Sequence, residues 1–287
     1  MTQPSGTLDS QLQHQQEVAS GNRFEFGENW SKFLAVLNDE RIGWAEHSLR
    51  NMLETEDLRG KTFLDIGSGS GLFSLAARRL GARVHSFDYD PRSVACTMEL
   101  RRRYFPGDPD WTIEQGSVLD PGYLNRLGRF DVVYSWGVLH HTGAMWQALE
   151  NVAPLVADGG KLFLAIYNDQ GPISQRWRFI KRTYNRLPGP LRFTVVAPVL
   201  VHLYWRRTLK DLLRLRPFET WRAEGKGRGM SAWRDLIDWV GGYPFEVAKP
   251  EAIFDFYRKK GFTLTRLYTD GGSLGCNEFV FCKPAAR

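Results

Sequence analysis

The fold of this 287-residue chain is decided by the stretch Phe63-Leu64-Asp65-Ile66-Gly67-Ser68-Gly69-Ser70-Gly71-Leu72-Phe73. It predicts a short buried strand over 62–66, a glycine-rich turn, and a helix that turns its apolar residues toward a sheet. Glycines at such a turn allow positive φ, and a ligand can approach closely because no Cβ stands in the way. The first amides of the helix can hold an anionic group. The stretch therefore predicts a ligand site at the end of the first strand of an α/β sheet.

Two carboxylates make this turn more specific than a general nucleotide-binding turn. Asp65 lies two residues before the first glycine, where dinucleotide-binding folds usually keep the strand apolar. An acid at that point suits a cationic ligand. Asp88 ends the next predicted strand, 83–87, where a carboxylate can accept both hydroxyls of a ribose.

Together these residues resemble the cofactor-binding half of the class I S-adenosylmethionine-dependent methyltransferases. Four segments carry the resemblance in the expected order, namely 64–71, Asp88, 130–135 and 159–162, and it covers residues 58–168. It implies S-adenosyl-L-methionine as cofactor and an α/β, Rossmann-like, mostly parallel seven-stranded sheet with its last strand antiparallel. The alternative is a Rossmann-like domain that binds another nucleotide or none. The cofactor-binding residues that we expect are Asp65, Gly67, Ser68, Gly69, Gly71, Asp88, Tyr89, Ser117, Val118 and Trp136.

The third and fourth predicted strands supply the far side of this site. Related enzymes often have an Asp where Ser117 stands, so here Ser117, the Val118 amide or Gln115 would have to contact the adenine. The fourth strand, 131–135, runs into the loop 136–142. Ligands bind at the carboxyl ends of such strands, so this loop should face the reactive methyl group, with Trp136 beside the methionine part or the sulfonium.

Two histidines in that loop are candidates for a general base, since an imidazole can accept a proton near neutral pH. We expect His141 to be the catalytic residue; the alternative is a capping or packing histidine before a helix over 144–156. The loop looks similar to that of the ubiquinone-biosynthesis O-methyltransferases, which carry two glutamates and a histidine here. Aligned without gaps, those glutamates fall on Gly137 and His140, and only His141 matches. We therefore predict no metal site.

The chain is expected to form one α/β domain in four parts. These are an N-terminal arm with helices (1–57), the cofactor-binding core (58–170), a helical substrate cap inserted after a fifth strand 161–167 (171–247), and the C-terminal part of the core (248–287). The glutamine-rich N-terminus predicts a frayed or disordered arm, and apolar spacing predicts two amphipathic helices between Trp30 and Leu53. Residues 249–260 predict the helix before the last two strands, 262–268 and 277–282. The insert is too long for a loop without structure of its own.

The insert also carries the positive charge of the chain. Between Gln170 and Pro217 there are eleven Lys or Arg and one acid, a balance of +10, so the net charge of +6 leaves −4 elsewhere. Its segment 191–207 is apolar with basic flanks. This segment predicts either contact with a membrane surface or packing on the core or on a second subunit of a homodimer.

The expected reaction is methyl transfer to an oxygen or nitrogen of a small, aromatic or amphipathic acceptor, which the protein mainly aligns. The residues expected to contact that acceptor are Trp30, Tyr167, Asn168 and Tyr243. One alternative is a tRNA or rRNA methyltransferase that grips phosphates with the basic insert, although no RNA-binding module is recognisable and no nucleic acid is expected as a partner. Another is a non-catalytic interaction subunit, which the intact glycines and acids argue against.

Cysteine usage and hydropathy predict the compartment. The three cysteines show no metal or disulfide spacing, which suits a reducing cytosol. No run reaches the ~18–20 apolar residues of a membrane span. We therefore expect a cytoplasmic protein.

Overall fold

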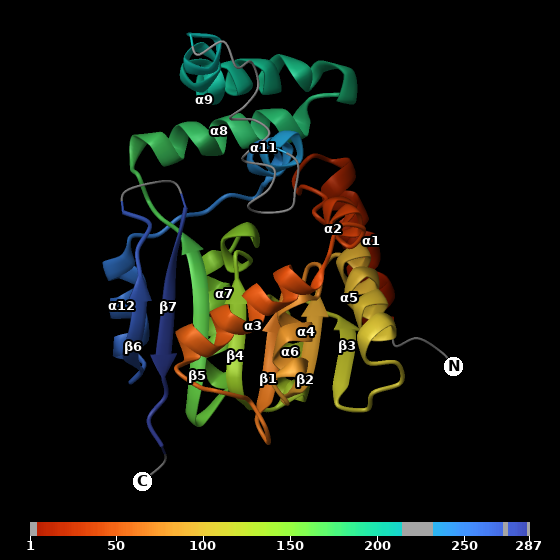
Figure 1. Cartoon of the computed structure of the whole chain (residues 1–287), viewed down its shortest axis with the longest axis vertical. Helices are drawn as coiled ribbons and strands as arrows, with labels where there is room; N and C mark the ends of the chain where they lie inside the picture. Colours follow the sequence, from red (N-terminus) through yellow and green to blue (C-terminus); the bar gives the residue numbers. More distant parts are fainter. Residues whose placement is uncertain (1–4, 214–231, 272–274, 286–287) are drawn as a thin grey trace.

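The computed structural model describes residues 5–213, 232–271 and 275–285, and its centre is a seven-stranded sheet (Figure 1). The strands are β1 (Thr62–Ile66), β2 (Arg83–Asp88), β3 (Trp111–Gln115), β4 (Phe130–Trp136), β5 (Val156–Tyr167), β6 (Thr263–Tyr268) and β7 (Cys276–Cys282). Their order is β3-β2-β1-β4-β5-β7-β6. Neighbours among β1 to β5 are parallel, whereas β7 runs antiparallel to both β5 and β6. The predicted Rossmann-like sheet with an antiparallel last strand is confirmed.

Helices cover both faces of this sheet. One face packs on α3 (Asp39–Leu53), α4 (Leu72–Arg79) and α5 (Pro91–Tyr104), and the other on α6 (Pro121–Leu127), α7 (Met145–Val152) and α12 (Pro250–Lys259). Phe63 and Phe163 belong to the core of the first face, and Leu64 and Leu162 to that of the second. Because both faces are buried, β1 reads as an apolar run interrupted only by Asp65.

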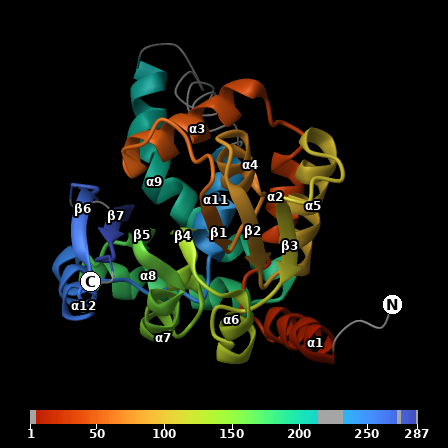
Figure 2. The same cartoon turned by 90° about the horizontal axis from the view of Figure 1, so that it is seen from below.

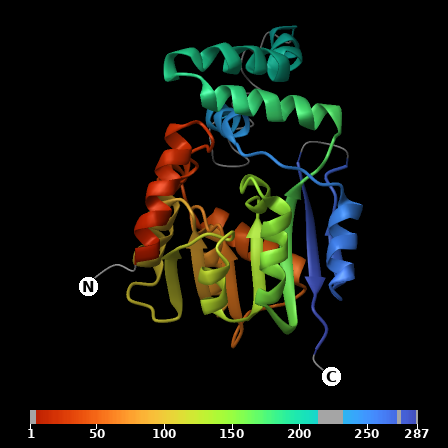
Figure 3. The same cartoon turned by 180° about the vertical axis from the view of Figure 1, so that it is seen from behind.

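Among the described residues, three helices form a cap beyond the carboxyl ends of the parallel strands, as Figures 1 and 3 show. They are α8 (Pro172–Arg186), α9 (Phe193–Leu213) and α11 (Ala232–Gly241). A buried cluster joins them, with Trp177 from α8, Val199 from α9 and Val240 from α11. The predicted helical cap after the fifth strand is thus present in its described parts, whereas residues 214–231 of the predicted cap lie outside the described residues. Helix α9 continues through Pro198.

The N-terminus differs from the sequence-based expectation. Residues Ser5–Ala19 form helix α1, so the prediction of a frayed or disordered arm is wrong for this segment. The helix lies at the β3 edge of the sheet (Figure 2), where the buried His14 packs edge-on against Tyr89 with 5.3 Å between ring centroids. This tertiary contact holds a segment whose own composition favours disorder. Helices α2 (Gly27–Phe33) and α3 follow, as the two predicted amphipathic helices.

Two predicted boundaries around β5 are also wrong. Helix α7 ends at Val152 and not at residue 156, because Pro154 lies in a short 3-10 turn over 153–155. Strand β5 begins at Val156 and not at residue 161, since Val156 pairs with Phe130 and the Gly159 amide donates to the Lys283 carbonyl at 3.0 Å.

Within the described ranges 5–213, 232–271 and 275–285, no helix is long and apolar enough to cross a membrane.

Candidate functional site

The glycine-rich turn between β1 and α4 exposes bare backbone at the centre of the sheet. Gly67 and Gly69 have φ of +76° and +55°, a region that side chains rarely adopt. A Cβ on Gly67 would lie 2.4 Å from a Val138 methyl group, and one on Gly69 would lie 3.0 Å from the Trp30 indole nitrogen. Only glycine therefore fits at both positions, and the loops after β1 and β4 meet here.

Asp88 closes this turn against the end of β2. Its two carboxylate oxygens accept hydrogen bonds from the backbone amides of Gly69 and Asp90, each at 2.9 Å. Each oxygen keeps a further acceptor position, so the half-buried carboxylate can still receive the two hydroxyls of a ribose. Burial raises the pKa of Asp88 to about 7, and the two amide hydrogen bonds act in the opposite direction.

Asp65 lies deeper than a ligand-contacting residue usually does. Its side chain is 2% exposed and accepts a hydrogen bond from the Ser74 hydroxyl at 2.5 Å. Burial raises the pKa of Asp65 to about 7, with a smaller contribution from the negative charge of Asp88. The carboxylate lies toward Ser74 on α4, so we expect it to act on a bound cation through its charge and not by direct contact.

The residues expected around the adenine occupy the neighbouring strand ends. The Tyr89 ring lies under the Arg23 guanidinium at 4.8 Å, and the Gln115 amide donates to the Tyr89 carbonyl at 3.1 Å. The Ser117 hydroxyl accepts from the Leu119 amide at 3.1 Å, and Val118 is buried in the core. Their contacts with a cofactor stay predictions. Ser68, on the glycine turn, shares a hydrogen bond of 2.9 Å between its hydroxyl and the Thr97 hydroxyl.

The loop after β4 borders open space. A Cβ on Gly137, whose φ is +74°, would meet no atom within 4 Å. The adjacent Trp136 is exposed and lies near the carboxylate of Glu278 on β7. Burial raises the pKa of Glu278, and the Trp136 side chain acts in the opposite direction. The indole thus lies at the strand end where the cofactor's methionine part is expected, and Glu278 was not found from the sequence.

His141 is arranged as a neutral imidazole with one free nitrogen. Its Nδ1 lies 2.6 Å from the Pro244 carbonyl oxygen, so Nδ1 carries the proton and Nε2 carries the lone pair. In the part of the chain that the structure describes, Nε2 has no hydrogen-bond partner. Burial lowers the pKa of His141 to about 3, against the effect of the Pro244 hydrogen bond. The residue is therefore neutral at pH 7 and able to accept a hydrogen bond.

His140 and a lysine from the cap lie behind His141. His140 is fully buried, and its Nδ1 accepts from the Tyr167 amide at 3.4 Å; burial lowers its pKa well below the usual value. Lys181 is also fully buried, donates to the Trp239 carbonyl, and lies 4.1 Å from the centroid of that indole ring. The charge of Lys181 further lowers the pKa of both histidines. A lysine on a helix is usually solvated, so no signal in the sequence indicated this position.

The four residues expected to contact the acceptor have different surroundings. Tyr167 lies among aromatic rings, 5.5 Å from His141, 5.7 Å from Trp239 and 5.3 Å from Phe245. These rings together with Phe26, 5.0 Å from His141, are called the aromatic cluster below.

The other three acceptor candidates are tied to different parts of the chain. Trp30 packs on the Gly69 backbone, at the glycine turn and not in the aromatic cluster. Asn168, which directly follows β5, is buried, and its side-chain oxygen accepts from the side-chain amide of Asn277 on β7 at 3.1 Å. The Tyr243 carbonyl accepts from the Phe24 amide at 2.8 Å. The structure thus brings only Tyr167 into contact with His141.

The N-terminal segment 14–30 lies across all these loops. The Arg23 guanidinium donates to the His141 carbonyl at 3.1 Å, pairs with Glu17 at 2.6 Å, and lies over Tyr89. The Gly27 amide donates to Asp90 at 2.8 Å. The segment therefore covers the strand ends at β1, β2 and β4 together. Apart from the Arg23–Glu17 pair, these contacts join residues more than 60 positions apart, and patterns in the local sequence do not indicate such pairs.

A metal centre was not expected from the sequence. Among the residues that the structure describes, no group of three or more His, Cys, Asp or Glu side chains could hold a metal ion. Transfer without a metal stays a prediction, tested below.

Comparison with known proteins gives consistent results. A family described as a methyltransferase domain matches residues 40–223. The ubiquinone biosynthesis O-methyltransferase of Xanthomonas oryzae pv. oryzae is 30% identical over 223 residues, 77% of this chain and 82% of that protein. The ribosomal protein L11 methyltransferase of Methylococcus capsulatus is 41% identical over 69 residues, 24% of each chain.

Solved structures of methyltransferases share the fold. Magnesium protoporphyrin IX methyltransferase from Synechocystis PCC 6803, with bound SAH, matches 84% of this chain and 83% of its own with a TM-score of 0.50 and 14% identity. An O-methyltransferase family protein from Burkholderia thailandensis matches 87% of this chain and 59% of its own with a TM-score of 0.52 and 13% identity. At these identities the likeness concerns the fold alone.

Proposed function

Because this chain belongs to the class I S-adenosylmethionine-dependent methyltransferases, we propose that it transfers the methyl group to a hydroxyl oxygen of a small aromatic acceptor. The acceptor lies between the loop after β4 and the underside of the cap. One observation carries the proposal: His141 donates from Nδ1 to Pro244 and keeps Nε2 free, next to a cluster of aromatic rings.

The residues present fit the cofactor. The glycine turn leaves its backbone bare, Asp88 retains two acceptor positions, and the loop at Gly137 borders open space. When bound, S-adenosylmethionine supplies a methyl group on a positively charged sulfur, so the protein has to align the acceptor and remove one proton. Asp88 would hold the ribose, and Trp136 would present an aromatic face to the cation.

His141 is the residue that would take the proton. The hydroxyl O–H bond would break and an O–CH₃ bond would form as the S–CH₃ bond breaks. The sulfur would then leave as a neutral thioether, and the positive charge would end, with the proton, on the imidazole of His141. A pKa of about 3 makes protonation at pH 7 unfavourable by roughly 5 kcal/mol. Because His141 is a weak base, it accepts a proton more readily from an acidic hydroxyl group. This favours a phenol, with a pKa of about 10, over an aliphatic alcohol as the acceptor. The low pKa of His141 thus supports a phenol as the class of acceptor.

The surroundings of His141 support a flat acceptor. Phe26 and Tyr167 lie at 5.0 and 5.5 Å from the imidazole, and rings at such distances pack well on another aromatic ring. The relative at 30% identity is named an O-methyltransferase, which supports oxygen over nitrogen as the accepting atom.

The test is a screen for label transferred from methyl-labelled cofactor to phenols, catechols, alcohols and amines, with mass analysis of the product. The purified protein should label phenolic oxygen, and His141→Ala should lower turnover by roughly 10² to 10⁴-fold with cofactor affinity nearly unchanged. The exposed His47 on α3 provides the matched control, His47→Ala, which should keep full turnover. Near-normal turnover of His141→Ala would remove His141 from the mechanism, and label found only on nitrogen would refute the acceptor class.

A further inference from the structure

Two rows of side chains cross the sheet near the carboxyl ends of β4 and β5, on the face that α3 and α4 cover. In the outer row, Trp136 on β4 pairs with Ala165 on β5, and Ala165 pairs with Glu278 on β7; the three strands are neighbours in Figure 1. The inner row belongs to the core of that face and consists of Tyr134, Phe163 and Val280. Residues two apart on a strand share a face, so Trp136 and Glu278 lie on either side of the small Ala165.

Two carboxylates at this face have no cation beside them. Glu278 is half-buried, and Asp65 lies next to Tyr134 in the register of β1 and β4. In the described ranges, no Lys, Arg or His side chain forms an ion pair with Glu278 or with Asp65. Burial raises the pKa of both groups. A carboxylate that is removed from water costs free energy unless a cation or hydrogen-bond donors compensate for it, so this face favours a cationic ligand.

The hydroxyl of Tyr134 is a second and independent indication of a ligand. The side chain is 3% exposed, and among the described residues its hydroxyl oxygen is buried without a hydrogen-bond partner. Burial raises the pKa of Tyr134 well above its usual value, and the negative charges of Asp65 and Glu278 raise it further. The hydroxyl is thus within reach of both charges. Such a buried oxygen would gain free energy by accepting a hydrogen bond from a ligand.

We propose that Glu278, Tyr134 and Trp136 form a binding site for a protonated amine, named here the ammonium site. An ammonium group has three N–H donors. The Glu278 carboxylate and the Tyr134 oxygen accept from it, and the face of the Trp136 ring attracts its charge. Two reactants can supply the group, namely the methionine part of the cofactor and a phenolic acceptor with an amine side chain. The second source rests on the proposed transfer to a phenol, whereas the first does not.

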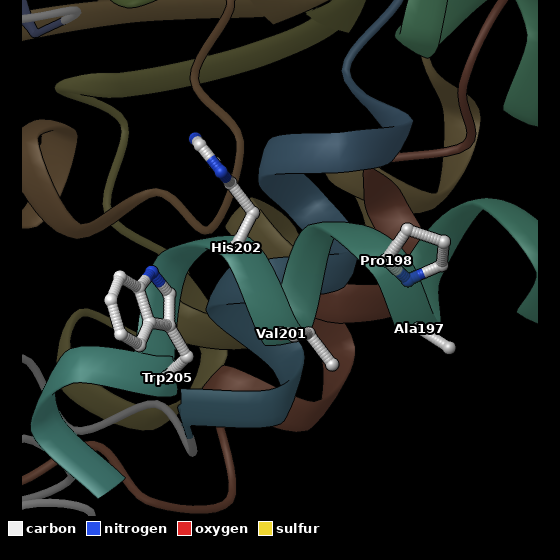
Figure 4. Close-up of a pocket in the computed structure, with 5 residues that line it drawn as sticks. All are labelled: Ala197, Pro198, Val201, His202 and Trp205. Atoms are coloured by element: carbon white, nitrogen blue, oxygen red, sulfur yellow. The ribbon is translucent and has the colours of Figure 1, made fainter. Parts of the chain in front are cut away.

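The surroundings of His141 and the groove on α9 differ from the ammonium site in charge. The charges that act on His141 come from Lys181 and Arg23 and are positive, so they would repel an ammonium group. The groove on α9, of about 720 Å³, has no carboxylate in its lining (Figure 4), which consists of Ala197, Pro198, Val201, His202 and Trp205. An amine on a reactant is therefore directed toward β7, and the aromatic cluster is left to the phenol ring.

Calorimetry on the full-length protein tests the cofactor as the source. S-adenosylhomocysteine carries the ammonium group, and methylthioadenosine has the same adenosine and thioether without the amino-acid part. Glu278→Gln should weaken binding of S-adenosylhomocysteine by at least about tenfold, because a charge-assisted hydrogen bond is lost. Binding of methylthioadenosine should stay unchanged.

The acceptor is tested as the source by titration into protein that is saturated with S-adenosylhomocysteine. Tyramine and para-propylphenol have the same ring and nearly the same shape, and only tyramine carries an ammonium group. If the acceptor supplies the group, Glu278→Gln should weaken binding of tyramine by at least about tenfold and leave para-propylphenol unchanged. A loss confined to S-adenosylhomocysteine assigns the ammonium site to the cofactor, and a loss confined to tyramine assigns it to the acceptor.

Tyr134→Phe removes only the buried hydroxyl. It should weaken binding of the same ligand by about threefold to tenfold. The ligand-free variant should unfold at a urea concentration no lower than that of wild type, because the hydroxyl has no partner to lose. The matched control is Glu54→Gln, which removes an exposed carboxylate paired with Arg266 at the end of α3 and should leave all four affinities unchanged.

Three results would overturn the proposal. They are Glu278→Gln binding both S-adenosylhomocysteine and tyramine as wild type does, an equal loss for methylthioadenosine, and a Tyr134→Phe variant that unfolds at lower urea. If Glu278→Gln fails to fold, Tyr134→Phe still decides the outcome through the same four ligands. Failure of the proposed transfer to a phenol would instead appear in the product screen, and the comparison of S-adenosylhomocysteine with methylthioadenosine does not depend on it.

Discussion

Replacing Asp65 with asparagine should stabilise the cofactor-free protein, and the gain should grow as the pH rises. Burial raises the pKa of Asp65 from 3.8 to about 7, so the carboxyl ionises less readily in the folded chain than in the unfolded chain. The stability associated with its protonated form is fully present below about pH 4 and is lost as the pH rises to about 7. Relative to a side chain that does not ionise, this shift in the pKa of Asp65 lowers the free energy of unfolding by about 2 kcal/mol at pH 5 and about 4 kcal/mol at pH 8.

The measurement is the free energy of unfolding in urea from pH 5 to pH 8. Asparagine keeps an oxygen that can accept from Ser74 but does not ionise, and any fixed cost of its buried amide is the same at every pH. The difference between Asp65→Asn and wild type should therefore widen by about 2 to 3 kcal/mol across this range. Parallel curves for the two proteins would show that the Asp65 carboxyl is not titrating there, and the argument from burial would be wrong.

Asp131 is a suitable control for this experiment. Burial acts to raise its pKa, but hydrogen bonds from the Thr62 amide and hydroxyl, each at 2.8 Å, outweigh that effect and the pKa is lowered. Asp131 is thus ionised throughout pH 5 to 8 in both states, and the difference in unfolding free energy between Asp131→Asn and wild type should stay constant over this range.

A bound sulfonium favours the ionised form of Asp65. Calorimetry in two buffers of different ionisation enthalpy should therefore show proton release when the cofactor binds near pH 7.

Three further outcomes follow from the site. Asp88→Ala should weaken S-adenosylmethionine binding by roughly 10²-fold, because two charge-assisted hydrogen bonds to the ribose are lost; wild-type affinity by calorimetry would exclude the predicted contact. Arg23→Met should raise the cofactor dissociation rate in stopped-flow measurements by roughly threefold to tenfold, since the hydrogen bond to the His141 carbonyl and the contact with Tyr89 are lost. The control Arg59→Met, at an exposed position, should leave this rate unchanged. Exhaustive chelation should leave methyl transfer intact, and activity that returns only with added magnesium or zinc would contradict this.

The sequence by itself determined the sheet, and it predicted where the cofactor binds. Strand β1 was predicted with its observed bounds, because a short apolar run followed by three spaced glycines has few alternative conformations. The position of Asp88 at the end of β2 also follows from local pattern. Such features depend on residues close together in the chain, which is where periodicity and turn chemistry are informative.

The tertiary structure decided how the site is enclosed and which atoms are free. The pairing of His141 with Pro244, the burial of Lys181 under Trp239, and the position of Arg23 over Tyr89 each join segments at least 58 residues apart. The same is true of helix α1, whose own sequence favours disorder. The free energy of these contacts comes from burial and from hydrogen bonds between distant segments, so it has no counterpart in local spacing or composition. For that reason the sequence could identify His141 as a candidate base, but only the folded chain showed which of its nitrogens is free.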